Sequence, residues 1–141
     1  MKADSSSIVR TTLRWILAIF YAVAGYLHIV APDGFLLIMP IGVPFPEEVV
    51  FWTGAAEILG ALGLVQPWSR RIRLYAGAGL GLYALCVWPA NVNHFAMDMA
   101  RADLGLGLAY HVPRMIVQPF LIWLALWVGG ATDWPFRPKS S

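Results

Sequence analysis

The sequence has little of two things on which soluble proteins rely, cysteine and charge. A single cysteine, Cys86, stands inside an apolar run of the 141-residue chain, so no internal disulfide can form and no Cys-x-x-Cys pair exists. This absence argues against a thiol–disulfide relay within the chain. Charged residues make up 13% of the chain, against about 25% in typical soluble domains. The net charge of +2 gives no case for binding nucleic acid.

What the sequence has in abundance is apolar residues, which make up 59% of it. A membrane-spanning helix needs about 20 largely apolar residues. Four segments qualify, at about 13–30, 49–65, 74–95 and 112–128. The first resembles a signal peptide in its basic start, but its apolar run continues to Val30, which favours a transmembrane helix. We therefore expect residues 1–141 to form one all-α membrane domain, a four-helix bundle.

The basic residues predict the orientation of this bundle. Three Lys or Arg precede the first span, three lie between the second and third, and two follow the fourth, whereas the opposite side has only Arg101 and Arg114. Lys and Arg concentrate in cytoplasmic loops. Both termini are therefore expected in the cytoplasm, and the chain in the cell (inner) membrane as a multi-pass protein. The lipid bilayer is then its first partner.

The first outer loop, residues 33–48, is unusually apolar but too short to span a membrane. We expect a short helix lying in the outer interface, followed by an extended proline segment. This loop either caps the outer mouth of the bundle or is an apolar connector that rests on lipid.

Strongly polar residues inside the spans all fall in the expected outer half. His28 lies near the outer end of the first span, and Glu57 lies eight residues into the second, roughly 12 Å deep at about 1.5 Å per residue. Such residues in a membrane usually face the bundle interior or a cavity. If the polar stripes of the four spans turn inward, they form one polar pocket that opens outward.

Glu57 and His28 are the candidate catalytic residues of this pocket. A carboxylate as deep as Glu57 is either neutral or paired, and it either transfers protons or forms a structural pair, for which Arg114 is a candidate partner. Arg114 either binds an anionic group or extends to the interface. The other candidate ligand-binding residues are Asn91, His94, Gln118, Trp88 and Trp52; the amides also serve as contacts between helices, and the indoles can stack on a flat ligand.

No metal is expected, because the histidines lack the local spacing of the usual metal motifs. Hydrogen bonding at the interface suits His28 and His94 better, and His111 is expected at the interface too. Cys86 is expected to be an inert packing residue. Small residues such as Gly77 and Gly81 allow close helix packing, within the bundle or against a second copy, so a homo-oligomer stays open.

Several ordered pieces of the sequence carry a family resemblance: Ala24-Gly25-Tyr26-Leu27-His28, Ala31-Pro32-Asp33, Ile38-Met39-Pro40, Val43-Pro44-Phe45-Pro46, Thr53-Gly54-Ala55-Ala56-Glu57-Ile58-Leu59-Gly60, Gly63-Leu64, Pro67 and Trp88-Pro89-Ala90-Asn91. Together they resemble the DoxX family of small bacterial four-helix membrane proteins, in its DoxX-like branch. They cover about half of the chain, and the fourth span matches only in character. The recurrent His, Glu and Pro-Ala-Asn positions of that family correspond to His28, Glu57 and residues 89–91.

The resemblance implies a membrane subunit or anchor of a redox-linked complex, because the family is similar to the membrane subunit of a thiosulfate:quinone oxidoreductase. It makes a quinone the candidate cofactor and a soluble or membrane redox protein the candidate partner. Two alternatives stay open. One is a stand-alone membrane enzyme with acid–base chemistry on a lipophilic substrate, and the other is a structural membrane protein without catalysis. Whether the chain is an enzyme, as an oxidoreductase subunit would be, stays undecided.

Overall fold

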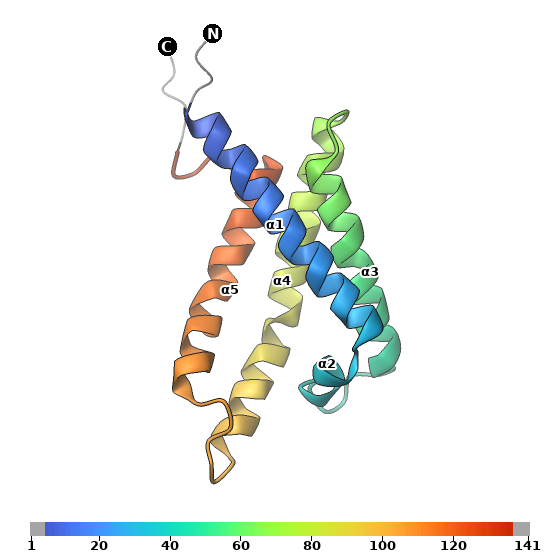
Figure 1. The fold of residues 1–141 in the computed structure, drawn as a ribbon, viewed down its shortest axis with the longest axis vertical. Coiled ribbons are helices and arrows are strands. Elements are labelled where there is room, and N and C mark those ends of the chain that lie inside the picture. Colours follow the sequence, from blue (N-terminus) through green and yellow to red (C-terminus); the bar gives the residue numbers. More distant parts are fainter. Residues whose placement is uncertain (1–4, 137–141) are drawn as a thin grey trace.

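The computed structural model describes residues 5–136, which form four long helices and one short one (Figure 1). The long helices are α1 (Ser5–Val30), α3 (Pro46–Val65), α4 (Arg70–Met99) and α5 (Leu108–Gly129). The short helix α2 (Asp33–Leu37) lies in the connection between α1 and α3. No strand occurs within the described residues. The all-helical prediction is confirmed, and each long helix extends beyond the span predicted from hydropathy.

Local sequence signals set the helix ends. Helix α3 begins at Pro46, whose missing N–H costs nothing at a first turn, and it ends before Gln66-Pro67. Helix α4 is capped by Ser69, whose hydroxyl accepts a hydrogen bond from the Ile72 N–H at 3.3 Å. Helix α5 ends just before Gly130, which adopts the left-handed conformation (φ 93°) that glycine tolerates best.

Three helices are long and apolar enough to cross a membrane, over Ser7–Val30, Pro46–Val65 and Leu108–Gly129. Helix α4, which contains the predicted span 74–95, is not among them. Its mean hydropathy is lowered by its glycines, its two tyrosines and the Trp88-Pro89-Ala90-Asn91 segment. Large apolar side chains such as Ile19, Leu59 and Ile116 are mostly exposed on the outside of the bundle, which is the arrangement expected for contact with lipid.

The helices form two close pairs, α1 with α3 and α4 with α5, and α3 packs on α4 to join them. Glycines allow the closest approaches. A Cβ atom on Gly25 of α1 would lie 2.5 Å from the Gly54 carbonyl oxygen of α3, and a Cβ on Gly77 of α4 would lie 2.7 Å from the Gly129 Cα of α5. These small residues therefore serve packing within the bundle.

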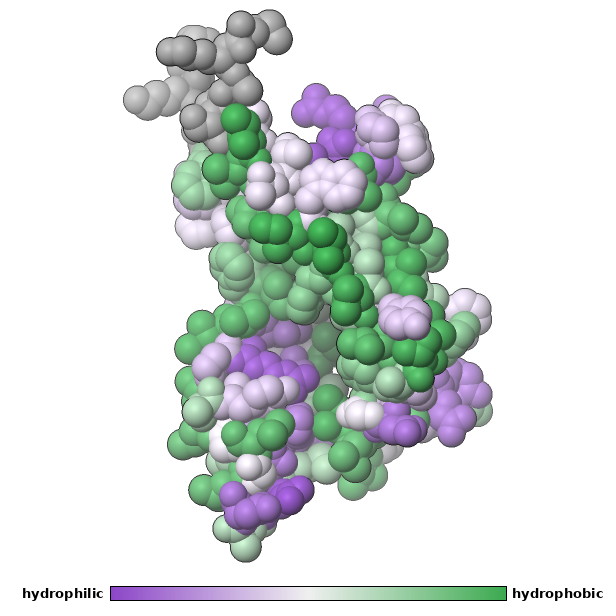
Figure 2. Space-filling model, in the orientation of Figure 1, coloured by the Kyte–Doolittle hydropathy of each residue, from purple (hydrophilic) through white to green (hydrophobic). Residues whose placement is uncertain are grey.

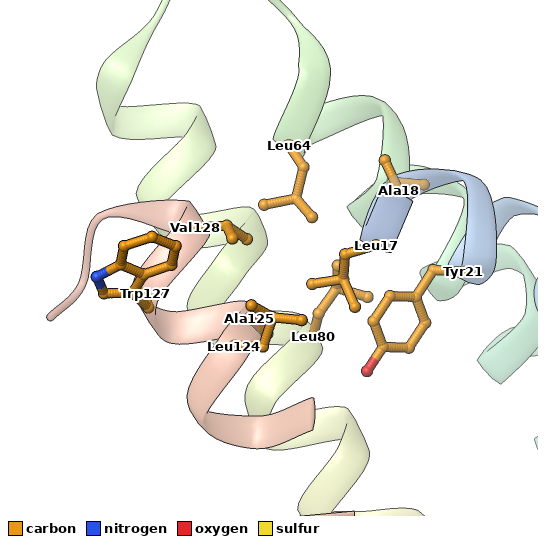
Figure 3. Close-up of a cluster of buried hydrophobic side chains, with 10 residues drawn as sticks. Leu17, Ala18, Tyr21, Leu64, Leu80, Leu124, Ala125, Trp127 and Val128 are labelled. Atoms are coloured by element: carbon orange, nitrogen blue, oxygen red, sulfur yellow. The ribbon is translucent and has the colours of Figure 1, made fainter. Parts of the chain in front are cut away.

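We call the part of the bundle near the chain ends and the α3–α4 turn the terminal half, and the part near α2 and the α4–α5 loop the cavity half (Figure 1). The buried apolar core lies in the terminal half (Figure 3). It consists of Leu17, Ala18, Tyr21, Ala61, Leu64, Leu80, Leu124, Ala125, Trp127 and Val128.

Two arginines of α1 close the terminal half against the end of α5. Arg10 Nε donates to the Trp127 carbonyl at 2.7 Å, and Arg14 Nε donates to the Val128 carbonyl at 3.0 Å. Arg10 also forms an ion pair with Asp133 at 2.9 Å. Carbonyls in the last turn of a helix have no partners within the helix, and cations there are favourable. Arg10 and Arg14 thus have a structural role that the sequence analysis did not foresee; Lys2, Arg137 and Lys139 lie outside the described residues.

Candidate ligand-binding site

A cavity of about 690 Å³ occupies the cavity half, between the α1–α3 pair and the α4–α5 pair. All four long helices contribute to its wall, which is largely apolar. The wall also contains His28, Glu57, Asn91, Arg114 and Gln118. These polar residues come from all four long helices and line one cavity, as the sequence predicts, but the rest of its wall is apolar. A volume of this size lies within the roughly 300–1,000 Å³ of small-molecule sites.

The α2 segment closes the cavity at its end. Phe35 of α2 lies against His28, with ring centroids 3.7 Å apart, and the Asn93 side chain of α4 donates to the Ile38 carbonyl at 3.0 Å. Both Phe35 and Ile38 line the cavity. The expected short helix is confirmed, and of the two interpretations of this loop the structure supports the cap.

The centre of the site is a buried hydrogen bond between His28 Nδ1 and Glu57 Oε2, 2.6 Å long. The glycine crossing of α1 and α3 builds it, because Gly25 lies one turn before His28 and Gly54 lies three residues before Glu57. A Cβ atom on Gly54 would lie 2.7 Å from the His28 Cβ. Glu57 is only 3% exposed. This bond joins a carboxyl group to an imidazole, the two kinds of group that acid–base chemistry most often uses.

The partner considered for Glu57 from the sequence was Arg114, and the structure corrects this. Arg114 forms no ion pair with any carboxylate within residues 5–136. Glu57 instead bonds His28, because the close α1–α3 crossing places the two side chains on adjoining turns.

Asn91 and Gln118 connect α4 to α5 on the opposite wall. Asn91 Nδ2 donates to Gln118 Oε1 at 3.1 Å, and Gln118 Nε2 donates to the Ala84 carbonyl. Ala84 lies two turns before Asn91, so both bonds cross the same helix interface. Both amides are buried and both line the cavity. They form the contact between helices that was expected of them, and they can also contact a ligand in the cavity.

Arg114 lines the cavity and is held from the side of the α4–α5 loop. Its NH1 atom donates to His94 Nδ1 at 2.9 Å and to the Tyr110 hydroxyl at 3.1 Å. The guanidinium carbon lies 5.5 Å from the centre of the Tyr110 ring, within the range of a cation–π contact. His94 itself does not line the cavity, so it acts on the site through Arg114.

Behind His94 lies a carboxylate that the sequence analysis missed. Asp98 Oδ2 accepts hydrogen bonds from the Leu106 N–H and from His111 Nε2, each at 2.9 Å, and it lies 3.6 Å from His94 Nε2. The Leu106 N–H, followed by the His111 ring, lowers the pKa of Asp98 below its ordinary 3.8. The spacing of His94 and Asp98, four residues apart on one helix, was the available signal.

His111, which was expected at the membrane interface, has a fully buried side chain. It turns away from the cavity that Arg114 and Gln118 line and bonds Asp98 instead. The loop between α4 and α5 folds back over this cluster. Gly105 in that loop has φ 53°, and a Cβ atom there would collide with the Asp98 carboxylate.

His94, Asp98 and His111 offer ligand atoms within 4.8 Å of one another, a spacing at which a metal ion can bind. The hydrogen bonds oppose this chemistry. A metal-bound histidine normally donates its second ring N–H to an acceptor. The second nitrogen of His94 instead faces a donor, Arg114, and His111 Nδ1 has no partner among the described residues. The cluster is therefore better suited to hold Arg114 and the loop than to hold a metal.

The positions of three other side chains differ from those expected from the sequence. Trp88 is partly buried but does not line the cavity, and Trp52 is exposed beside a separate shallow groove formed with Phe45 and Ala56. Cys86, expected to be an inert packing residue, is exposed and belongs to the cavity wall. Helical periodicity predicts which residues share a face but not how each helix is rotated toward its neighbour.

The cavity opens sideways between α1 and α5. The packing between these two helices is limited, and the side-chain bonds of Arg10 and Arg14 to the end of α5 lie in the terminal half. Figure 2 shows a hollow between the lower part of α5 and α1. Phe20 of α1 and Val117 of α5 both line the cavity and are about half exposed. In a bilayer this apolar opening would face lipid.

Residues 17–129 match the family model of a domain of unknown function, DUF8561. The chain belongs to this family. The matched range includes all or part of each helix and every cavity residue described above. No curated protein and no solved structure matches the chain. The description of the family gives no activity, so the resemblance to the DoxX family stays a prediction.

Proposed function

We propose that this DUF8561 chain is a four-span protein of the cell membrane, with both termini in the cytoplasm and the cavity half toward the outer leaflet. Three apolar helices support the membrane location. Helix α4 packs between α3 and α5 in the same bundle, and its 30 residues give a length of about 45 Å, at about 1.5 Å per residue. Among the described basic residues, Arg10, Arg14 and the 70–73 cluster lie toward the terminal half, which favours that half for the cytoplasm.

In this membrane, the cavity receives the polar head group of a small lipid-soluble molecule. The observation that carries this proposal is the buried His28–Glu57 bond in the wall of an apolar cavity that opens toward lipid. Buried ionisable groups in a membrane are costly and are found mostly at functional sites. The DoxX-like resemblance makes a quinone the first ligand to test.

As a DoxX-like subunit or anchor, the chain would serve a redox-linked complex whose electrons come from a soluble or membrane redox partner. Reduction of a quinone to a quinol takes up two electrons and two protons. His28 and Glu57 would pass those protons to the quinone oxygens, while Arg114 or Gln118 would donate a hydrogen bond to them. The chain itself would supply positioning and protons rather than electrons.

Extraction in mild detergent followed by mass spectrometry of everything that co-purifies tests this proposal. We expect a redox protein in fixed ratio, a bound quinone, or both, and we expect Glu57→Gln and Arg114→Ala to weaken their retention. Arg101→Ala is the matched control, because Arg101 lies at the same end of the molecule but pairs with Asp103 outside the cavity. If both cavity variants kept all partners and all activity, the cavity would have no such role.

The same hydrogen bond favours a second candidate, a stand-alone membrane enzyme. A histidine and a glutamate joined at 2.6 Å beside a lipid-accessible cavity are sufficient for acid–base catalysis on a lipophilic substrate. Turnover by the purified chain without partners would select this candidate. If Glu57→Gln reduced stability and changed nothing else, a purely structural role for the pair would be correct.

A further inference from the structure

The positive charge of Arg114 in the cavity wall has no negative charge beside it. Its two hydrogen-bond acceptors, His94 and Tyr110, are both uncharged when they accept from it. Within residues 5–136 no carboxylate lies within ion-pair distance of the guanidinium. The nearest carboxylate of the network, Asp98, is reached only through the His94 ring. The cavity therefore has a cation in its wall without an anion beside it.

The other ionisable groups of the wall do not supply that anion. Glu57 is the cavity's carboxylate, and it is already bonded to His28. It forms no ion pair with Arg114. Arg114 is partly buried, and a hydrogen-bonded anion stabilises such a cation more than one that is fully exposed to water.

The rest of the wall is suited to a hydrocarbon chain. Apolar residues such as Val50, Val87 and Leu121 surround the space between the helix pairs. Phe20 and Val117 continue this apolar lining to the side opening between α1 and α5. A cationic group near one side of the cavity and an apolar exit to the bilayer are complementary to a molecule that has a charged head and a single apolar chain.

We propose that the cavity binds a single-chain amphiphile with an anionic head group, of which a long-chain carboxylate is the simplest. Its head group accepts hydrogen bonds from Arg114, and its chain leaves between Phe20 and Val117. This inference rests on the proposed function, that the cavity binds a lipid-soluble molecule, and adds the charge of the head group. His94, Asp98 and the loop bonds to Asp98 position Arg114 for this contact.

Paired ligands that differ only in their head group test the proposal. The purified full-length protein, in a neutral detergent at pH 8, is titrated with oleate and with oleyl alcohol, and binding is followed by intrinsic tryptophan fluorescence and by thermal unfolding. We expect oleate to bind at least about tenfold more tightly, because hydrogen bonds to charged groups contribute about 1.5–3 kcal/mol. Acetate, which has the head without the chain, should bind poorly.

Variants then test whether the preference for oleate over oleyl alcohol depends on Arg114. Arg114→Gln should remove the gap between oleate and oleyl alcohol, and Arg101→Gln should preserve it. Should Arg114→Gln fail to fold, Arg114→Lys keeps the charge but loses the planar donor pair, so it should keep only part of the gap. Because the comparison of ligands in the unmodified protein needs no variant, it tests the head-group preference even if neither folds.

Other results would overturn the inference in distinguishable ways. Equal binding of oleate and oleyl alcohol, or tighter binding of a neutral quinone analogue, would contradict the anionic head group and leave the lipid-binding cavity standing. A gap that survived Arg114→Gln would place the anion elsewhere and contradict the assignment to Arg114. Absence of binding by oleate, oleyl alcohol and the quinone analogue alike would overturn both this inference and the proposed function.

Discussion

The two halves of this bundle are built from the same four helices, but one half is filled by side chains and the other encloses a cavity. In the terminal half, leucine, alanine and valine fill the space between the helix pairs (Figure 3). Two arginines of α1 close the end of α5. In the cavity half, the same helix pairs enclose a space of about 690 Å³ whose wall contains a buried acid, a histidine, an arginine and two amides. The cavity lies between the two helix pairs rather than within either of them.

This difference shows where the fold tolerates buried polar residues. A polar group buried in a close-packed region needs its partner in place, and in the cavity half each has one: His28 for Glu57, Asn91 for Gln118, His94 for Arg114. Each partner comes from the other helix of the same pair, so these bonds fix the two helices of each wall against one another. The closely packed terminal half would be the anchor from which the cavity half is positioned.

Breaking the His28–Glu57 bond should have the largest effect on stability. His28→Leu removes the imidazole that bonds the buried Glu57 carboxyl, and loss of one member of a buried pair costs about 3–5 kcal/mol. Thermal unfolding in a fixed detergent measures this loss.

The double variant His28→Leu with Glu57→Leu sharpens the test. Replacement of both partners by apolar residues is often close to neutral, so stability should largely return while ligand retention stays lost. A double variant that unfolds as readily as the single one would mean that the pair stabilises the fold through contacts other than the one between its two members.

The next largest effect should come from the closest contact of the terminal half. Gly77→Ala places a methyl group 2.5 Å from the Ala125 carbonyl oxygen and 2.7 Å from the Gly129 Cα, both backbone atoms that cannot easily move. Overpacking of this kind costs about 1–3 kcal/mol. Gly79→Ala is the matched control two residues away on the same helix, because nothing lies within 4 Å of its Cβ position. Equal unfolding temperatures for both variants would contradict the close α4–α5 crossing.

Helical periodicity and depth were sufficient to predict that polar residues from four helices meet in one pocket. They did not predict the pairing within it. Arg114 was the candidate partner of Glu57 from depth alone, whereas the Gly25–Gly54 crossing brings His28 closer. A crossing depends on how two helices are rotated against each other, and the residue pattern of a single helix does not contain that information.

The same reason explains the errors at Trp52 and Trp88, which lie within a turn of cavity residues but point elsewhere. Asp98 was missed for a different reason. It lies beyond the predicted span 74–95, and its partners Leu106 and His111 are brought to it by a tight loop. That loop needs positive φ at Leu104, Gly105 and Gly107, which spacing along a helix cannot indicate.

A smaller effect is expected from the amide pair of the cavity wall. Gln118→Leu leaves the Asn91 amide and the Ala84 carbonyl each short of a partner. Hydrogen bonds between membrane helices contribute about 0.6 kcal/mol on average and up to about 1.7, so we expect a loss of about 1 kcal/mol. A double-mutant cycle with Asn91→Leu should recover most of it as coupling. Coupling near zero would show that the two amides act independently.

The smallest effect should be an acid transition confined to the α4–α5 loop, the part of the cavity half farthest from the core. Arg101 and the Gly105 N–H lower the pKa of Asp103 to about 2, and the Leu106 N–H lowers that of Asp98 below 3.8. A lowered pKa in the folded state means that the carboxylate stabilises the loop above its ordinary pKa. That stabilisation is lost as the pH falls through the lowered value.

Amide chemical shifts of the isotope-labelled protein in detergent can follow both groups, since the Gly105 N–H bonds Asp103 and the Leu106 N–H bonds Asp98. We expect the Gly105 shift to titrate near pH 2 and the Leu106 shift below 3.8, while amides of the terminal half stay unchanged over the same range. Asp103→Asn should remove the Gly105 transition and leave that of Leu106. If core amides around Leu64 and Val128 moved together with the loop, the two halves would unfold as one unit, and the terminal half could not act as an independent anchor for the cavity.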